Sequence, residues 1–340
     1  MNEKLLPRSL GLAALACSLF AAQASANDFC TRTAGAAFRA CALGVADDRA
    51  LAEGICINVS DAEEREDCFE EANKTRLEES KLCAERKAAR LDLCKVFGEG
   101  RYDPPFEPSL FDSDFANLTQ PNRYFPLTIG NKWEYAGGEE IVKIEVLDRT
   151  KLIEGVTCIV SNDQAFSGGD LIENTDDWFG QAKNGDVYYC GEEVKDFESF
   201  DGDEPRLPEL ISIDGSFKTG RNFDKPGIIF LGNPKKGDVY RQEFSLANAE
   251  DVAEVLTTTY SFGGPDRTLD EFVPQQLAKL FCQNDCVVTK DINPNEPGIF
   301  ERKYYAPGIG MFLSVNPQKK EAVQLVSCSF DPRCNSLPKQ

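Results

Sequence analysis

The sequence predicts an α+β protein, in which a disulfide-stapled antiparallel helical hairpin precedes an antiparallel β-rich domain. The first observation behind this prediction is a set of six cysteines near the N-terminus, whose separations are 11, 15, 12, 15 and 11 residues. The second is a change of pattern after residue 120, where short stretches rich in β-branched and aromatic residues alternate with turn residues. A barrel, a half-barrel and a sandwich are all compatible with this many short strands.

Residues 1–26 have the pattern of a secretory signal peptide. Lys4 and Arg8 precede an apolar run over residues 10–22, and a small-residue cleavage pattern ends at Ala26. A lipoprotein signal ending at Cys17 is the alternative. Cleavage after Ala26 removes one of the 13 cysteines and leaves an even number, which is typical of a fully oxidised exported protein. We therefore expect a periplasmic or extracellular protein, with no later segment apolar enough to form a transmembrane helix.

The composition excludes several classes of function. The chain has 57 acidic and 37 basic residues and a net charge of −20, so its surface repels nucleic acids and anionic lipids. It has no histidine, which excludes imidazole bases and histidine metal ligands. Oxidised cysteines would also exclude thiolate nucleophiles. We therefore expect no catalytic residues and no cofactor other than Ca²⁺, and the expected partner is an extracytoplasmic protein or a small ligand.

The mirror spacing of the cysteines predicts a helical hairpin over residues 27–98. Separations of 11 and 15 residues keep cysteines on one broad helix face, so two antiparallel helices bring them together in nested pairs. These pairs are Cys30–Cys94, Cys41–Cys83 and Cys56–Cys68. Ser60 and Glu63 form a candidate capping box for the second helix, and Gly98 ends it. In the first helix, Gly44 allows a break near residues 44–49. The hairpin is either a stalk or docking arm, or a rigid lid packed on the second domain.

Residues 99–121 are rich in proline, aspartate and phenylalanine and predict a linker, and residues 122–334 predict the β-rich domain. Two short helices are expected inside this domain, at Ala247–Val255 and Pro274–Leu280. We expect Cys158 to pair with Cys190, because both lie in strands that can be neighbours. The last four cysteines either close two short loops or tie a strand near residue 286 to the C-terminal strand; they are Cys282, Cys286, Cys328 and Cys334.

Several segments of the β-rich part resemble a recurring domain of uncharacterised secreted bacterial proteins. They include "NKWEY" at Asn131–Tyr135, "TDDWFGQAKNGDVYYCGE" at Thr175–Glu192 and "EPGIFERKYYAPGIG" at Glu296–Gly310. The resemblance covers residues 120–328 and leaves the hairpin outside it. It implies a fold and carries no established activity or catalytic residues.

Acidic and aromatic residues gather in three sequence clusters. Cluster 1 contains Glu173, Asp176, Asp177, Trp178, Asp186, Tyr188, Glu192 and Glu193; cluster 2 contains Tyr240, Arg241, Glu243, Glu250 and Asp251; cluster 3 contains Asp291, Glu296, Glu301, Arg302, Tyr304 and Tyr305. Carboxylates on neighbouring strands can bind Ca²⁺, which takes 6–8 oxygen ligands. The candidate ligands are Asp176, Asp177, Asp186 and Glu192, although the chain has no EF-hand loop. The alternative is an acidic face that is solvated or paired with arginine.

These observations favour an exported, non-catalytic binding or structural protein. It would be stabilised by Ca²⁺ if the carboxylate site forms, and it would use the hairpin as a stalk or docking arm. One alternative is a secreted glycosidase-like hydrolase that uses paired carboxylates. Another is a carrier that holds its ligand in a pocket of the β-domain.

Overall fold

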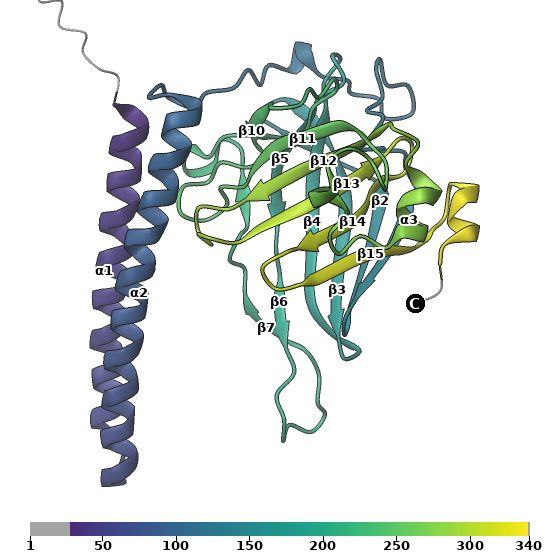
Figure 1. Ribbon diagram of the computed structural model, residues 1–340. Coiled ribbons are helices and arrows are strands. Elements are labelled where there is room, and N and C mark those ends of the chain that lie inside the picture. The colour runs from purple at the N-terminus through teal and green to yellow at the C-terminus, as the bar shows by residue number, and fades with distance from the viewer. Residues whose placement is uncertain (1–27, 339–340) are drawn as a thin grey trace, which may run out of the picture.

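The computed structural model describes residues 28–338, which form a long helical hairpin beside a large curled β-sheet (Figure 1). The α+β arrangement predicted from the sequence is therefore confirmed. The predicted signal peptide at residues 1–26 lies outside the described residues. Within residues 28–338, no helix combines the length and the apolar character needed to cross a membrane.

The hairpin consists of α1 (Phe29–Ile57) and α2 (Ala62–Phe97), and a third short helix is α3 (Gln275–Phe281). The strands are β1 (Lys132–Gly137), β2 (Glu140–Ile153), β3 (Val156–Ser167), β4 (Asp170–Gln181), β5 (Val187–Glu193), β6 (Asp196–Glu198), β7 (Glu209–Ser212), β8 (Phe217–Lys218), β9 (Gly227–Phe230), β10 (Val239–Arg241), β11 (Val252–Tyr260), β12 (Cys286–Ile292), β13 (Phe300–Ala306), β14 (Gly310–Asn316) and β15 (Glu321–Cys328). Four short 3₁₀ turns complete the described elements: Pro108–Leu110, Arg221–Phe223, Arg267–Asp270 and Pro332–Ser336.

The hairpin has all three predicted disulfides, Cys30–Cys94, Cys41–Cys83 and Cys56–Cys68, with Cα–Cα distances of 5.6, 5.8 and 5.5 Å. Helix α1 is continuous through Gly44, so the break allowed near residues 44–49 does not occur. The cap of α2 also differs from the prediction. The side chain of Asp61, not that of Ser60, accepts hydrogen bonds from the amides of Glu63 and Glu64 at 2.9 and 3.0 Å. An aspartate can make the same N-terminal bonds as a serine and also favours the helix dipole.

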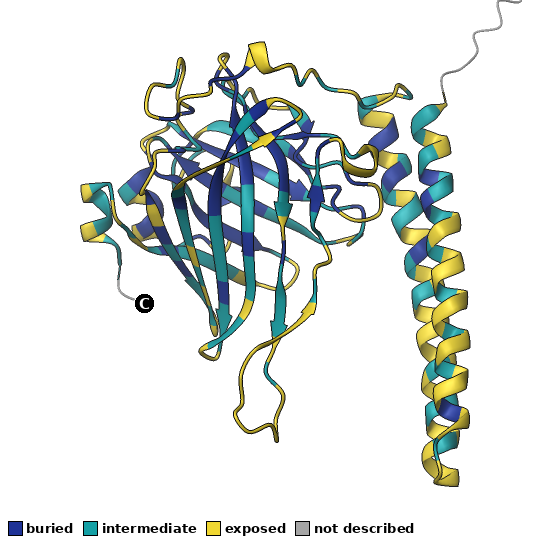
Figure 2. Ribbon diagram, turned by 180° about the vertical axis from the view of Figure 1, so that it is seen from behind, coloured by how far each residue is buried: buried dark blue, intermediate teal, exposed yellow. Residues whose placement is uncertain are grey.

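The base of the hairpin packs against the β-domain. Arg90 of α2 forms a buried ion pair with Glu250, and it also donates a hydrogen bond to the side chain of Asn295 at 2.6 Å. Arg86 donates to the backbone oxygen of Asn295 at 2.8 Å. Further from this contact, most of the hairpin is exposed, as Figure 2 shows. The hairpin is thus held at one end and projects at the other.

The β-domain is built on one 15-stranded sheet, in which neighbouring strands are antiparallel. The main order is β10-β11-β12-β13-β14-β15-β1-β2-β3-β4-β5-β8, so most neighbours in the sheet are also neighbours in the chain. Strands β6 and β7 continue from β4, and β9 pairs with β5. The sheet is long enough to curl, and its inner face encloses the main hydrophobic core.

The two ends of the sheet approach one another without closing it. A single bridge between Lys225 and Phe244 joins the segments beside β9 and β10. Gly227 permits this approach, because a Cβ atom at that position would lie 1.8 Å from the backbone oxygen of Gln242. The architecture is therefore closest to the half-barrel among the three alternatives.

Three disulfides stabilise the β-domain. Cys158 and Cys190 are bonded as predicted, but their strands are not neighbours, because β4 lies between β3 and β5. The remaining four cysteines close two short loops, Cys282–Cys286 and Cys328–Cys334. The six disulfides within residues 28–338 indicate an oxidising compartment.

One of the two expected short helices is correct and one is wrong. The helix expected at Pro274–Leu280 is present as α3. The helix expected at Ala247–Val255 is instead a turn followed by strand β11, in which Ala253 pairs with Asp291 of β12. Backbone pairing on both sides of β11 outweighs the helix propensity of its alanine and glutamate residues. The predicted linker at residues 99–121 crosses the surface, and it buries Phe111 and Phe115 in the domain.

Candidate functional site

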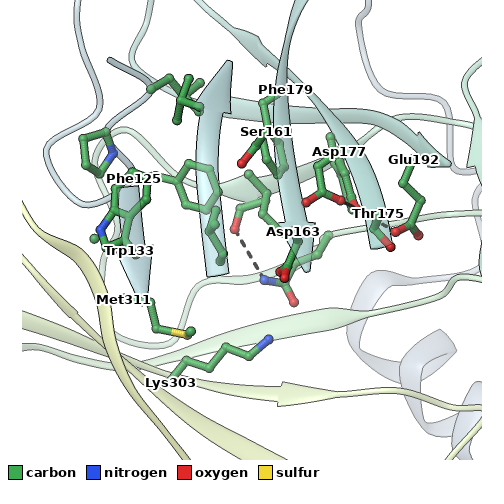
Figure 3. A pocket seen from close by; sticks show the side chains of 18 of the residues that line it. Phe125, Trp133, Ser161, Asp163, Thr175, Asp177, Phe179, Glu192, Lys303 and Met311 are labelled. Atoms are coloured by element: carbon green, nitrogen blue, oxygen red, sulfur yellow. Dashed lines mark hydrogen bonds between the residues drawn. The ribbon is translucent and has the colours of Figure 1, made fainter. Parts of the chain in front are cut away.

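A cavity of about 330 Å³ lies inside the curl of the sheet. Strands β1 to β5 provide one wall, and β13, β14 and the segments next to β10 and β11 provide the other. Its two ends differ in character, as Figure 3 shows: Phe125, Trp133 and Met311 lie at one end, and Asp177 and Glu192 lie at the other. The cavity is therefore amphipathic.

The apolar end presents ring faces and aliphatic groups. The indole nitrogen of Trp133 donates to the backbone oxygen of Ile309 at 2.7 Å, and the hydroxyl of Tyr135 donates to that of Met311 at 2.9 Å. The polar atoms of both rings are thus engaged in the wall. Phe125 packs edge-on against Phe179 with ring centroids 5.0 Å apart. These contacts leave an apolar surface for an aliphatic or aromatic group.

Strand alternation gathers the carboxyl groups of the other end. Successive side chains of a strand point to opposite faces, so alternate residues of β4 line the cavity, as do those of β3. Six acidic residues border the cavity: Asp163 from β3, Glu173 and Asp177 from β4, Glu192 from β5, and Glu243 and Asp251 from the facing wall. All six side chains are half-buried, since the part of each that is exposed faces the cavity.

A β-bulge places Glu192 on the cavity side. The register between β4 and β5 shifts by one residue between Trp178 and Phe179, and on the far side of this shift Glu192 lies opposite Asp177. Gly191 lies at the shift with a φ of 140°, and a Cβ atom there would come within 2.4 Å of the backbone oxygen of Phe217. Only glycine suits such a position. The bulge thereby brings Tyr189 and Glu192 to the same face, although they are three residues apart.

Asp177 and Glu192 form a pair bridged by Tyr189. The tyrosine hydroxyl lies 3.0 Å from Glu192 Oε2 and also contacts Asp177 Oδ1. Burial raises the pKa of Asp177 to about 7, and the hydrogen bond from Tyr189 only partly opposes this effect. Burial, together with the charge of Asp177, raises the pKa of Glu192 to about 9. At neutral pH the pair therefore holds at least one proton.

The facing wall carries a second acidic pair and one lysine. Burial and the neighbouring Asp251 raise the pKa of Glu243 well above its usual range. Burial raises the pKa of Asp251 to about 6, although the positive charge of Lys303 opposes the shift. The Lys303 Nζ lies 3.1 Å from Asp291, so this cation is already paired outside the group of six. Burial also raises the pKa of Asp163 well above its usual range. Among the described residues, the cavity lining thus has six carboxyl groups and one lysine, whose ammonium pairs with Asp291.

The four predicted calcium ligands do not come together. Asp177 and Glu192 face each other, as described above. Asp176 points to the outer face, where it pairs with Arg149 and accepts a hydrogen bond from Asn162 at 3.1 Å. Asp186 lies in the β4–β5 turn and accepts a bond from the amide of Gly232 at 2.7 Å. Over the described range 28–338, no group of three or more acidic or cysteine side chains is arranged to hold a metal ion. The structure therefore gives no support to a calcium site formed by these four residues.

Residues from different sequence clusters lie around the same cavity in the structure. Cluster 1 supplies Asp177 and Glu192, and cluster 2 supplies Glu243 and Asp251 on the opposite wall. Cluster 3 contributes Tyr305 to the lining and Asp291 as the partner of Lys303. Sequence reasoning missed Asp163 and Lys303. Asp163 has the same strand parity as the lining residue Ser161, and this alternation is the signal that would have revealed it.

We compared the chain with protein-family models, with curated proteins and with solved structures, and none of them matches it. The resemblance described for residues 120–328 therefore stays a prediction. The geometry of the cavity supports two kinds of chemistry. Its protonated carboxyl groups can exchange protons for a cationic group, and the pair formed by Asp177 and Glu192 has the composition of an acid–base dyad.

Proposed function

We propose that this protein is an exported, non-catalytic binding protein, in the periplasm or outside the cell, and that its β-domain carries a small ligand in the cavity. The ligand would have a cationic amine at one end and an aliphatic or aromatic body at the other. The observation that carries the proposal is the convergence of six carboxyl groups on a cavity whose opposite end is apolar.

The size of the cavity supports a small-molecule ligand. Ligand pockets commonly measure about 300–1,000 Å³, and this cavity has about 330 Å³. The apolar end offers burial to a hydrocarbon body, at about 25 cal/mol for each Å² removed from water.

The charge of the cavity supports an amine. Without a ligand, burial opposes ionisation of Asp177, Glu192 and Asp251, as their raised pKa values indicate. A bound ammonium group would favour the ionised carboxylates and would take the place of protons. Binding should therefore release protons near neutral pH, and the affinity should rise with pH until the amine itself loses its proton.

Calorimetric titration with 2-phenylethylamine tests this proposal, and 2-phenylethanol serves as the uncharged probe of the same shape. We expect the amine to bind at least about tenfold more tightly, which corresponds to about 1.4 kcal/mol. The amine should also bind more tightly at pH 8 than at pH 6. Equal binding of the two probes, or no dependence on pH, would contradict the assignment of an amine.

Two variants on the same strand provide a matched comparison. Asp177→Asn removes a cavity carboxylate, and we expect it to weaken amine binding by about tenfold or more. Asp176→Asn changes the next residue, which points to the outer face, and it should leave binding unchanged. A probe glycoside that is hydrolysed by the wild type and not by Asp177→Asn would instead favour the hydrolase alternative.

A further inference from the structure

A second cavity lies at the junction between the hairpin and the β-domain, away from the ligand cavity of the sheet. Its volume is about 420 Å³. The N-terminal turn of α1, residues 100–102 and the segments at 222–224 and 241–250 line it. We call it the junction cavity. None of its lining residues also lines the cavity of the sheet.

Arg241 is the central residue of the junction cavity. It is only 8% exposed, and its guanidinium lies over three rings, those of Phe97 at 4.8 Å, Tyr102 at 5.5 Å and Phe244 at 4.7 Å. Stacking on rings holds the guanidinium in place without using its hydrogen-bond donors. Its Nη1 atom is buried and has no hydrogen-bond partner within residues 28–338.

Glu250 acts on Arg241 by its charge but makes no hydrogen bond to it. Glu250 lies close by, but its Oε2 atom accepts hydrogen bonds from Arg90 and from the amide of Ala247. Arg90 and Glu250 thus form a buried ion pair, whereas the buried Arg241 Nη1 has no acceptor among residues 28–338. Such a group carries a desolvation penalty that a bound anion would offset.

Arg90 and Arg101 also line the junction cavity, and Arg101 is the one of these two without a carboxylate partner in the described chain. The guanidinium of Arg101 lies 3.6 Å from the centre of the Phe29 ring, and in the described part of the chain it has no acidic partner. Asp224 is the one lining carboxylate other than Glu250 among the described residues. The three arginines therefore leave the junction cavity with a net positive charge, in a protein whose total charge is −20.

The rim of the junction cavity offers an apolar surface. Phe223 is 92% exposed, and it has a φ of 68°, next to Asn222 with a φ of 53°. A bulky residue in the left-handed region is strained, and such strain is concentrated at functional segments. Leu246, which is 40% exposed, lies on the same lining. An apolar group would remove both side chains from water.

We propose that the junction cavity binds a small organic carboxylate, whose carboxylate group is held by Arg241 and whose apolar body lies against Phe223 and Leu246. A guanidinium matches a carboxylate through two parallel hydrogen bonds. The presence of Asp224 and Glu250 disfavours a doubly charged anion such as phosphate. This site goes beyond the amine cavity, because it lies elsewhere and takes a ligand of opposite charge.

Titration of the intact protein with 3-phenylpropionate tests the proposal, with 3-phenylpropanol and inorganic phosphate as comparison probes. We expect the carboxylate to bind at least about tenfold more tightly than either. Arg241→Gln should reduce this affinity by about tenfold or more, whereas Arg149→Gln, on the outer face of the sheet, should not change it. If phosphate binds as tightly, or if Arg241→Gln binds normally, the assignment is wrong.

A second variant tests the site independently of any folding defect in Arg241→Gln. Phe223→Ser alters a side chain that is almost fully exposed, so it should leave the melting temperature unchanged or raise it. It should nevertheless weaken 3-phenylpropionate binding several-fold. Asp177→Asn should leave this binding intact, which separates the junction cavity from the amine site. Unchanged carboxylate affinity in Phe223→Ser would contradict the proposed position of the apolar body.

Discussion

Replacing Asp177 by asparagine should stabilise the unliganded protein at neutral and alkaline pH, and it should not do so at pH 4. The pKa of Asp177 is raised by burial from 3.8 to about 7 in the folded chain. Because the folded pKa lies above the unfolded value, the folded state prefers the protonated acid. The contribution of Asp177 to the free energy of unfolding is therefore fully present below about pH 4, and it is lost as the pH rises towards 7.

The size of this loss follows from the shift. Three pH units correspond to about 4 kcal/mol, because one unit of pKa is worth about 1.4 kcal/mol. Asparagine cannot ionise, so it avoids this loss, but it accepts a weaker hydrogen bond from Tyr189, which costs about 1 kcal/mol. Water in the cavity reduces the net gain further. We expect Asp177→Asn to be about 2 kcal/mol more stable than the wild type at pH 8 and slightly less stable at pH 4.

Urea unfolding at pH 4, 6 and 8 measures this difference, and fluorescence reports on the β-domain because both tryptophans, Trp133 and Trp178, lie there. Asp176→Asn is the control. Its partner Arg149 is half exposed, so loss of this pair should cost about 1 kcal/mol or less at every pH above 5. The reasoning is refuted if Asp177→Asn has the same stability difference at pH 4 and pH 8, or is the less stable protein at pH 8.

Four other perturbations test the fold around the two cavities. Gly191→Ala should lower stability by about 1–3 kcal/mol and weaken 2-phenylethylamine binding, because the β-bulge cannot accept a side chain; unfolding and calorimetry check both. Glu250→Gln leaves the charge of Arg90 buried and should cost about 3–5 kcal/mol, seen as faster proteolysis between the hairpin and the sheet. Loss of the middle rung in Cys41→Ala/Cys83→Ala should destabilise the hairpin by about 2–4 kcal/mol and leave tryptophan unfolding unchanged. Millimolar calcium should leave the melting temperature unchanged, since the four candidate carboxylates are separated; a clear rise would restore a calcium site.

The hairpin could be predicted from the sequence because covalent bonds and helix geometry determine it together. Fixed separations between cysteines select one nested pairing once both segments are helical. The details that failed were local choices between similar residues. Asp61 and Ser60 are both good caps, and the sequence alone does not decide which one lies at the first turn.

The cavity could be predicted only in part, because its residues meet through long-range strand pairing. The sequence identified Asp177 and Glu192 as members of one acidic cluster, and the β4–β5 turn brings them near each other. Their exact opposition depends on the bulge at Gly191, which resembles an ordinary turn glycine in the sequence. Asp251 approaches them only because the sheet curls, and the sequence marked its segment as helical. Curvature of a large sheet is a property of many strands together.

Glu250 and Asp251 show how closely the two cavities are connected, and this decides which variants can separate them. Consecutive residues of an extended chain point to opposite sides. Glu250 therefore reaches outward to Arg90 of the hairpin, while Asp251 borders the cavity of the sheet. A change at either residue disturbs the backbone of the other, so a loss of binding in such a variant cannot be attributed to one cavity. Asp177 and Phe223 belong to other segments of the chain, and each lines only one of the two cavities. An effect of Asp177→Asn on amine binding alone, and of Phe223→Ser on carboxylate binding alone, is therefore the pattern that two independent sites require.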